Sequence, residues 1–490
     1  MHLLETFVPS GIDPPWPTDR FSSKPWHWGG VPEPAPSSIT AGLQLDEFEL
    51  NKMKRAHQGF LGAVDSRLPH YIPHRYYSIS EESSSSSTTT PPSQGIVTVG
   101  GGKYFVVLVV SLRFLRRAGT TLPVEVFVPE DEYERKVCEN VLPKLNAVCR
   151  VFPQLRVQSS RDGSGWNRVA IQGFQLKAFA LLFASFDEVL FLDADNTAMH
   201  DVGPLFASAP FRQTGLVTWP DIWPTTVAPL YYDIATPATV RSPADQPSTE
   251  TGQLLIDKRR HWKTLLLAVC YNYHGPRFYY RLLNQGGPGM GDKETFLPAA
   301  AVVGLPAYQV HHPVDRVGHR FEDNSTSSRV LVQHDAAEDW AVTEAIAAQA
   351  TADAPQTEAE WNARYQGHVR PLFLHLSWPK WDPANLLQHM SKWSDMTKGV
   401  NGKPEPAFHY PPELAAPLRG TERMLWEEAR WVACHHRSVF RHWHNNHQAK
   451  LACNRLDIHF KRVLDTDVGR DMGLGPEDVL YPALPDSVTT

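Results

Sequence analysis

The chain has 490 residues, with 47 Lys and Arg against 53 Asp and Glu, and therefore a net charge of −6 when histidine is neutral. This balance excludes a nucleic-acid-binding protein, because phosphate contacts require clustered basic residues in excess. A hydrophobic fraction of 42% excludes a wholly disordered chain, and the length allows two or three domains or one large α/β domain with extensions.

The N-terminal residues 1–93 are rich in proline and serine, and we predict a stem-like region there. Within it, residues 43–61 show helical spacing of apolar side chains, and we expect this helix to dock on the body. The chain shows no signal peptide, and its most apolar stretch, residues 104–112, is too short for a membrane span. The five cysteines are too few for a disulfide scaffold, and their spacing leaves any pairing open.

From residue 95 onward the pattern alternates between strands and helices, which predicts an α/β fold with a mainly parallel sheet covered by helices. In chain order we predict a strand at 95–100, a helix at 103–118, a strand at 124–128, a helix at 130–142, a helix at 173–186, strands at 188–192 and 253–256, and a helix at 261–273. Residues 336–366 are predicted to form a helical insertion. Residues from about 390 onward are helical, rich in His and Trp, and without clear strands.

Two carboxylates, Asp193 and Asp195, follow the apolar strand at 188–192. Ligands of open α/β folds bind at the carboxyl ends of the parallel strands, so we expect both side chains at that edge of the sheet. An Asp-x-Asp pair there can hold Mg²⁺ or Mn²⁺, which would neutralise a nucleotide diphosphate. The alternative is that the two aspartates only cap the next turn.

Two further stretches carry candidate functional residues. In residues 285–296, glycines that allow close approach of a ligand precede Asp292 and Glu294, although acidic residues are also favourable at the start of any helix. In residues 373–381, His375 is a candidate third metal ligand and Lys380 a candidate phosphate partner. A lone histidine on an aromatic strand can equally be structural.

Five strings, in this order, resemble the fungal Golgi α-mannosyltransferases that branch and extend mannan, glycosyltransferase family 71. The strings are Phe174–Ala180, Val189–Asn196, Glu250–Asp257, His261–Leu267 and Gly291–Phe296, and the resemblance covers roughly residues 94–385. It implies a GT-A-type nucleotide-diphospho-sugar transferase fold, a GDP-mannose donor, Mn²⁺ (with Mg²⁺ as the alternative) and retention of anomeric configuration. It also implies three regions: the N-terminal stem at 1–93, a GT-A catalytic domain at 94–389 and a helical C-terminal extension at 390–490.

The resemblance also implies roles for individual residues. Asp193 and Asp195 resemble the metal-binding Asp-x-Asp motif of the family, and His375 with Lys380 is similar to the His and Lys pair that related retaining GT-A enzymes use for metal and diphosphate. Asp292, Glu294 and Glu250 resemble catalytic residues around the transferred sugar. The expected donor-binding residues are Lys177, Asp193, Gln253, Gly286, Gly287 and Lys380.

The implied activity is transfer of mannose from GDP-mannose to an α-linked mannoside acceptor, forming α-1,2 linkages or, as the next choice, α-1,3 linkages. Its expected setting is the synthesis of glycoprotein mannan and N-glycan outer chains in the Golgi lumen. Members of the family usually carry a membrane anchor, and this chain shows no membrane span. Two alternatives remain, namely a GT-A enzyme that uses a UDP-sugar and a catalytically inert mannan-binding protein.

Overall fold

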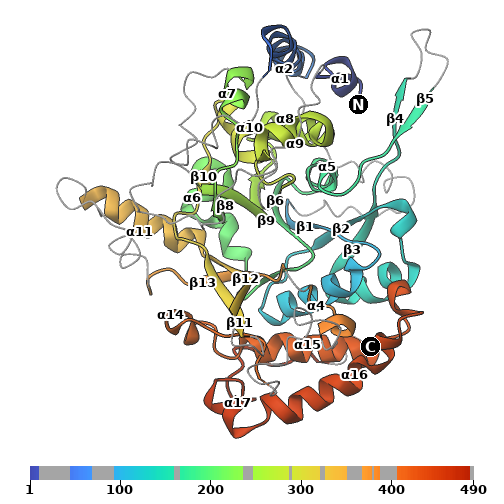
Figure 1. The fold of residues 1–490 in the computed structure, drawn as a ribbon, viewed down its shortest axis with the longest axis vertical. Coiled ribbons are helices and arrows are strands. Elements are labelled where there is room, and N and C mark those ends of the chain that lie inside the picture. Colours follow the sequence, from blue (N-terminus) through green and yellow to red (C-terminus); the bar gives the residue numbers. More distant parts are fainter. Residues whose placement is uncertain are drawn as a thin grey trace.

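The computed structural model describes residues 1–9, 45–68, 93–158, 166–235, 247–285, 290–320, 326–349, 367–377, 380–386 and 405–485. A seven-stranded sheet occupies the centre, in the order β10-β8-β9-β6-β1-β2-β3 (Figure 1). Its strands are β1 (Gln94–Val99), β2 (Val124–Val128), β3 (Ala147–Val151), β6 (Glu188–Leu192), β8 (Leu216–Pro224), β9 (Pro247–Asp257) and β10 (Tyr308–Gln309). All neighbouring pairs are parallel except those of β9, which runs antiparallel to β6 and β8. The predicted α/β architecture with a mostly parallel sheet is confirmed.

A second, four-stranded antiparallel sheet continues from the first. It has the order β11-β12-β13-β7, with β7 (Asn196–Ala198), β11 (Asp315–Arg320), β12 (Thr326–His334) and β13 (Pro371–His375). Only residues 193–195 separate β6 from β7, so the chain passes from one sheet to the other at the predicted Asp-x-Asp pair. A small hairpin pairs β4 (Leu155–Gln158) with β5 (Trp166–Val169).

Side chains of the central strands alternate between two cores. Ile96 and Leu190 belong to one core, whereas Val97 and Phe191 belong to the other, as the two-residue period of a strand requires. Because both faces of these strands are covered, their sequences are mostly apolar and do not alternate between apolar and polar residues.

The helices divide between the two faces. Those that share the core of Ile96 are α4 (Tyr104–Arg117), α6 (Ala209–Thr214), α11 (Ala336–Gln349), α13 (Pro383–Leu386), α14 (Pro412–Ala415), α15 (Thr421–His435) and α16 (His447–His459). Those that share the core of Val97 are α1 (His2–Thr6), α2 (Glu47–Arg67), α5 (Gln175–Phe183), α7 (Pro229–Ala235), α8 (Trp262–Tyr273), α9 (Tyr280–Asn284) and α10 (Phe296–Val302). A last short helix, α17 (Asp467–Asp471), follows α16.

The N-terminal helix α2 docks on the body, as predicted for residues 43–61, although it begins and ends a few residues later. Asp46 caps it by accepting a hydrogen bond from the backbone N–H of Glu49 (2.8 Å). Met53, Phe60 and Val64 on its inner face are buried in the same core as α8. The proline- and serine-rich residues 10–44 and 69–92 lie outside the described residues.

The C-terminal helices pack directly on α4, which shares a core with the central sheet (Figure 1). Arg113 of α4 is buried and donates from Nε to Glu428 of α15 (2.7 Å), and its guanidinium lies over the ring of Trp431, 3.6 Å from the centroid. The helical character predicted beyond residue 390 is confirmed for the described residues, apart from one isolated bridge between His409 and Gly318. The predicted domain boundaries stay a prediction. Of the predicted insertion, α11 covers residues 336–349, and residues 350–366 lie outside the described part.

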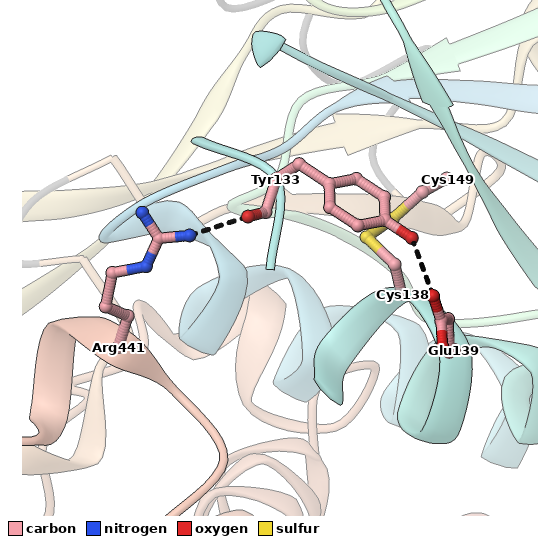
Figure 2. Close-up of a disulfide and its surroundings, with 5 residues drawn as sticks. All are labelled: Tyr133, Cys138, Glu139, Cys149 and Arg441. Carbon is pink, nitrogen blue, oxygen red and sulfur yellow. Dashed lines mark hydrogen bonds between the residues drawn. A yellow bond between two sulfur atoms is a disulfide. The ribbon is translucent and has the colours of Figure 1, made fainter. Parts of the chain in front are cut away.

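The continuous helix predicted for residues 130–142 is wrong. The chain instead forms a 3₁₀ turn (Glu130–Glu132), a π turn (Val137–Val141) and another 3₁₀ turn (Leu142–Leu145), and Tyr133 between the first two is extended. Tertiary contacts hold this break, as Figure 2 shows: Arg441 donates from Nη2 to the carbonyl of Tyr133 (2.6 Å), and Cys138 is joined to Cys149. In a regular helix the carbonyl of Tyr133 would accept a hydrogen bond from the backbone and would no longer be available to Arg441.

Two disulfides are present, Cys138–Cys149 and Cys434–Cys453, and Cys270 is a buried free thiol. The second disulfide joins α15 to α16. None of the helices in the described residues combines the length and the apolar character needed to cross a lipid bilayer.

Candidate active site

The carboxyl end of β6 forms the base of a polar site to which four elements contribute. The backbone N–H of Asp193 donates to the carbonyl of Gly252 on β9 (2.8 Å), and the N–H of Leu376 donates to the carbonyl of Asp195 (2.9 Å). His375, at the end of β13, is paired in register with Asn196 of β7. A Cβ at position 252 would lie 2.7 Å from Nδ1 of His375, so only glycine allows the imidazole to approach β9 this closely.

His375 lies between two carboxylates. Its Nε2 is 3.5 Å from Oδ1 of Asp195, and its Nδ1 is 3.4 Å from Oε1 of Glu250. Asp193, Asp195 and His375 each offer a ligand atom, and these atoms lie within 4.8 Å of one another. The three residues predicted as metal ligands are therefore brought together, and Glu250 orients the histidine from the opposite side.

Two lysines complete the site. Nζ of Lys177, on α5, is buried and contacts Oδ2 of Asp292 (3.0 Å), Oδ2 of Asp193 (3.4 Å) and the carbonyl of Thr251 (2.6 Å). Lys380 forms an ion pair with Asp195 and is the more exposed of the two, with 36% of its side chain accessible. Lys177 is thus fixed in the interior of the site, whereas Lys380 lies at its open side.

The charges of the site perturb one another strongly. Burial raises the pKa of Asp193 to about 6, although the nearby Lys177 opposes the shift. Burial would also raise the pKa of Asp195, but His375 and Lys380 outweigh it and hold this pKa well below its usual range. Burial would lower the pKa of His375, but Glu250 and Asp195 outweigh it and raise this pKa well above its usual value. In this arrangement His375 therefore carries a proton, which it must release to bind a metal ion.

The residues present fit a divalent cation. Four carboxylates, those of Asp193, Asp195, Glu250 and Asp292, share the site with two lysines, so negative groups are in excess. Burial is the main cause of the raised pKa of Asp193, and the neighbouring carboxylates of Asp195 and Asp292 add to it. Two carboxylates and one imidazole are ligands that Mn²⁺ and Mg²⁺ accept.

The other predicted residues are placed around this centre. Gln253 of β9 lies opposite Leu192 and accepts a hydrogen bond from the amide of Asn196. Glu294 does not join the metal-binding residues, because it accepts a hydrogen bond from the hydroxyl of Ser248 (2.6 Å), two residues before Glu250 on β9. Gly286 and Gly287 lie outside the described residues.

Three residues of the site were missed by the sequence analysis. Thr251 supplies both its carbonyl and its hydroxyl to Lys177, and the buried pair Asp221–Lys293 (3.1 Å) flanks the loop that carries Asp292. Thr251 adjoins Glu250 in a string that the analysis had already singled out. Asp221 gave no local signal, since β8 brings it to the site from a distant part of the chain.

A sequence family described as "Mannosyltransferase putative" matches residues 93–246 and 238–335. Alpha-1,2-mannosyltransferase MNN2 of Saccharomyces cerevisiae is 33% identical over 352 residues, which are 61% of this chain and 57% of that protein. Alpha-1,2-mannosyltransferase MNN23 of Candida albicans is 30% identical over 406 residues, 70% of this chain and 66% of that protein. The chain belongs to this fungal mannosyltransferase family.

The mannosyltransferase family match contains every predicted site residue except His375 and Lys380, which follow residue 335. The chain spans little more than half the length of MNN2 of S. cerevisiae. Among solved structures, the galactosyltransferase LgtC is 15% identical with a TM-score of 0.28, over 44% of this chain and 73% of that one. Mouse xyloside xylosyltransferase 1 is 12% identical with a TM-score of 0.29, over 44% of this chain and 84% of that one.

Proposed function

We propose that this protein is a metal-dependent, retaining α-mannosyltransferase that transfers mannose from GDP-mannose to an α-linked mannoside. The observation that carries the proposal is the meeting of Asp193, Asp195 and His375 beside Lys380 at the carboxyl end of β6. The relatives named above are alpha-1,2-mannosyltransferases, which favours an α-1,2 linkage, with α-1,3 as the next choice.

In the proposed mechanism, Asp193, Asp195 and His375 hold Mn²⁺, with Mg²⁺ as the alternative ion. When bound, the ion neutralises the charge that develops on the diphosphate as the bond to mannose breaks. Lys380 acts on the same diphosphate from the open side of the site, because charge-assisted hydrogen bonds to phosphate are among the strong ones. Asp195, which pairs with Lys380 in this structure, would also serve as a ligand of the ion.

Asp292 is proposed to face the transferred sugar. Its carboxylate is buried and is fixed by Lys177 at 3.0 Å. A fixed negative charge at this position stabilises the positive charge that develops at the anomeric carbon in the transition state. Glu250 orients His375, and Glu294, which is bound to Ser248, supports the wall of the site rather than reacting.

The acceptor side is proposed to include Phe174, at the start of α5. Its ring is 54% exposed and lies against Gly291, next to Asp292. Exposed aromatic rings pack well on the apolar faces of sugars.

The proposed setting is glycoprotein mannan synthesis in the Golgi lumen. The two disulfides support a secretory compartment, because disulfides persist in oxidising surroundings and are rare in the cytosol.

The test is nucleotide release from a panel of GDP- and UDP-sugars, with Mn²⁺ or with EDTA, and with α-mannobiose as acceptor. We expect GDP release from GDP-mannose alone, lost with EDTA and reduced at least about 100-fold in Asp195→Ala, since one ligand and a partner of Lys380 are removed together. Asp471→Ala, which removes an exposed carboxylate on α17, is the matched control and should leave the rate unchanged.

The other outcomes are decisive as well. Release from a UDP-sugar would keep the site and replace the donor. Absence of release from every donor, together with absence of GDP binding, would favour a catalytically inert mannan-binding protein. Full activity of Asp195→Ala would refute the metal-site assignment.

A further inference from the structure

A second cluster of metal-ligand side chains lies outside the candidate active site. His312, Asp315 and His334 each offer a ligand atom, and these atoms lie within 4.8 Å of one another. The two imidazole rings are stacked, with centroids 3.5 Å apart, and Nε2 of His334 is 3.3 Å from Oδ2 of Asp315. Both histidines are buried, whereas Asp315 keeps 28% of its side chain accessible.

The segment that carries His312 is held rigidly from α11. Asp339, which is fully buried, accepts hydrogen bonds from the backbone N–H groups of His311 (2.8 Å) and His312 (2.7 Å). The hydroxyl of Tyr308 donates to the same carboxylate. The cluster is therefore built on fixed backbone rather than on mobile surface side chains.

The hydrogen bonding of His312 suits metal binding. Nδ1 of His312 lies 2.8 Å from the carbonyl of Pro313, which can only accept, so Nδ1 carries the proton and Nε2 carries the lone pair. Metal-bound histidines usually have such a partner for the other ring nitrogen.

An ion pair between His334 and Asp315 does not account for the whole arrangement. Nδ1 of His334 is buried and has no hydrogen-bond partner among the described residues, which is unfavourable for a polar atom. A second imidazole also lies face to face with His334, and two such rings repel each other if both are protonated. A cation shared by the rings and the carboxylate would hold both imidazoles in the neutral form and so avoid this repulsion.

We propose that His312, Asp315 and His334 form a zinc site. Two imidazoles and one carboxylate are a typical donor set for Zn²⁺, and the partly exposed side of Asp315 leaves room for a water as fourth ligand. The candidate active site has the opposite composition, two carboxylates and one imidazole, which suits a harder ion. The two sites therefore select different metals.

The zinc ion would join three segments: the connection between β10 and β11, the start of β11 and the end of β12. β12 is paired with β13, and Leu331 of β12 lies opposite His375 in the register. The site thus stabilises the sheet that presents His375, without contacting the proposed substrates.

The test is zinc binding by the full chain after treatment with a chelator, measured by competition with a chromophoric zinc chelator and by the visible absorption of the Co²⁺ form. We expect one tight site in the wild type, in Asp195→Ala and in the exposed-histidine control His444→Gln. Asp315→Ala and His334→Gln should each weaken zinc binding at least about 100-fold, because each removes one of three protein ligands. Added zinc should raise the Tm of the wild type and of Asp195→Ala, but not that of Asp315→Ala.

Absence of a tight zinc site in the wild type would overturn the proposal, and so would unchanged affinity in Asp315→Ala. Loss of zinc only in Asp195→Ala would assign the ion to the candidate active site instead. Because Asp315 is partly exposed, its alanine variant is expected to fold, and circular dichroism checks this independently of zinc.

Discussion

At the scale of single residues, the two lysines of the candidate active site have different roles. Lys177 is buried and is satisfied by Thr251, Asp193 and Asp292, so its replacement would leave buried carboxylates unpaired and disturb the whole site. Lys380 is accessible and pairs with Asp195, a residue that the proposed metal ion would also engage. Lys380 is therefore the lysine that can change partners when a diphosphate arrives.

We predict that Lys380→Ala raises the KM for GDP-mannose about 10- to 100-fold, because one charge-assisted hydrogen bond to the diphosphate is lost. Steady-state kinetics with varied donor, together with GDP binding by calorimetry, measures this effect. Lys450→Ala, on the exposed side of α16, should leave both quantities unchanged. Unchanged donor affinity in Lys380→Ala would remove this lysine from the diphosphate site.

At the scale of elements, α2 docks on the body through an imidazole as well as through apolar side chains. His57 is buried beside Met53 and Phe60, and its Nε2 lies 2.8 Å from the hydroxyl of Tyr271 on α8. That hydroxyl lies 2.9 Å from the hydroxyl of Tyr231 on α7. Burial lowers the pKa of His57 to about 4, so the helix docks with a neutral histidine.

This shift predicts how stability depends on pH. Between pH 6.5 and pH 4 the unfolded chain binds a proton at His57 and the native protein does not, so acidification favours unfolding. The free energy of unfolding should fall by up to about 3 kcal/mol from this group over that range. Urea unfolding at a series of pH values should show a shallower dependence in His57→Gln, whereas the exposed His444→Gln should follow the wild type. Parallel curves for the wild type and His57→Gln would contradict the prediction.

At the scale of the whole molecule, the C-terminal helices and the central sheet are one packed body. The apolar core that contains Ile96 and α4 continues without interruption to α15 and α16. Within it, Glu428 of α15 pairs with both Arg113 (2.7 Å) and Arg117 (3.2 Å) of α4. Buried charges are tolerated only when paired, so these contacts make the position of α15 specific.

We predict that Arg113→Met lowers the free energy of unfolding by about 3 kcal/mol, because buried Glu428 then loses one of the two arginines that pair with it among the described residues. Arg135→Met is the matched control: it breaks an exposed ion pair with Glu139 and should cost less than about 1 kcal/mol. Chemical denaturation of both variants gives the comparison. Equal losses would show that the interface between α4 and α15 depends on apolar packing alone.

Much of the fold could be predicted from local pattern. The helix at 103–118 and the strands at 124–128 and 188–192 are found within one or two residues as α4, β2 and β6, because apolar periodicity and glycine or proline boundaries are encoded within each segment. Residues 130–142 were predicted wrongly, because the side chain that breaks the helix, Arg441, lies 300 residues further along the chain. Local pattern carries no information about such a partner.

For the candidate active site too, local sequence predicted one part and only the tertiary structure decided the rest. The sequence by itself determined the Asp-x-Asp pair after a buried strand and the resemblance to a family, since both depend on neighbouring residues. Only the tertiary structure decided that His375 lies between Asp195 and Glu250, that Lys177 joins Asp193 to Asp292, and that Glu294 is directed to Ser248 instead. The physical reason is that charge interactions act across distances of a few ångströms in space, and the packing of strands and helices sets which distant side chains come that close.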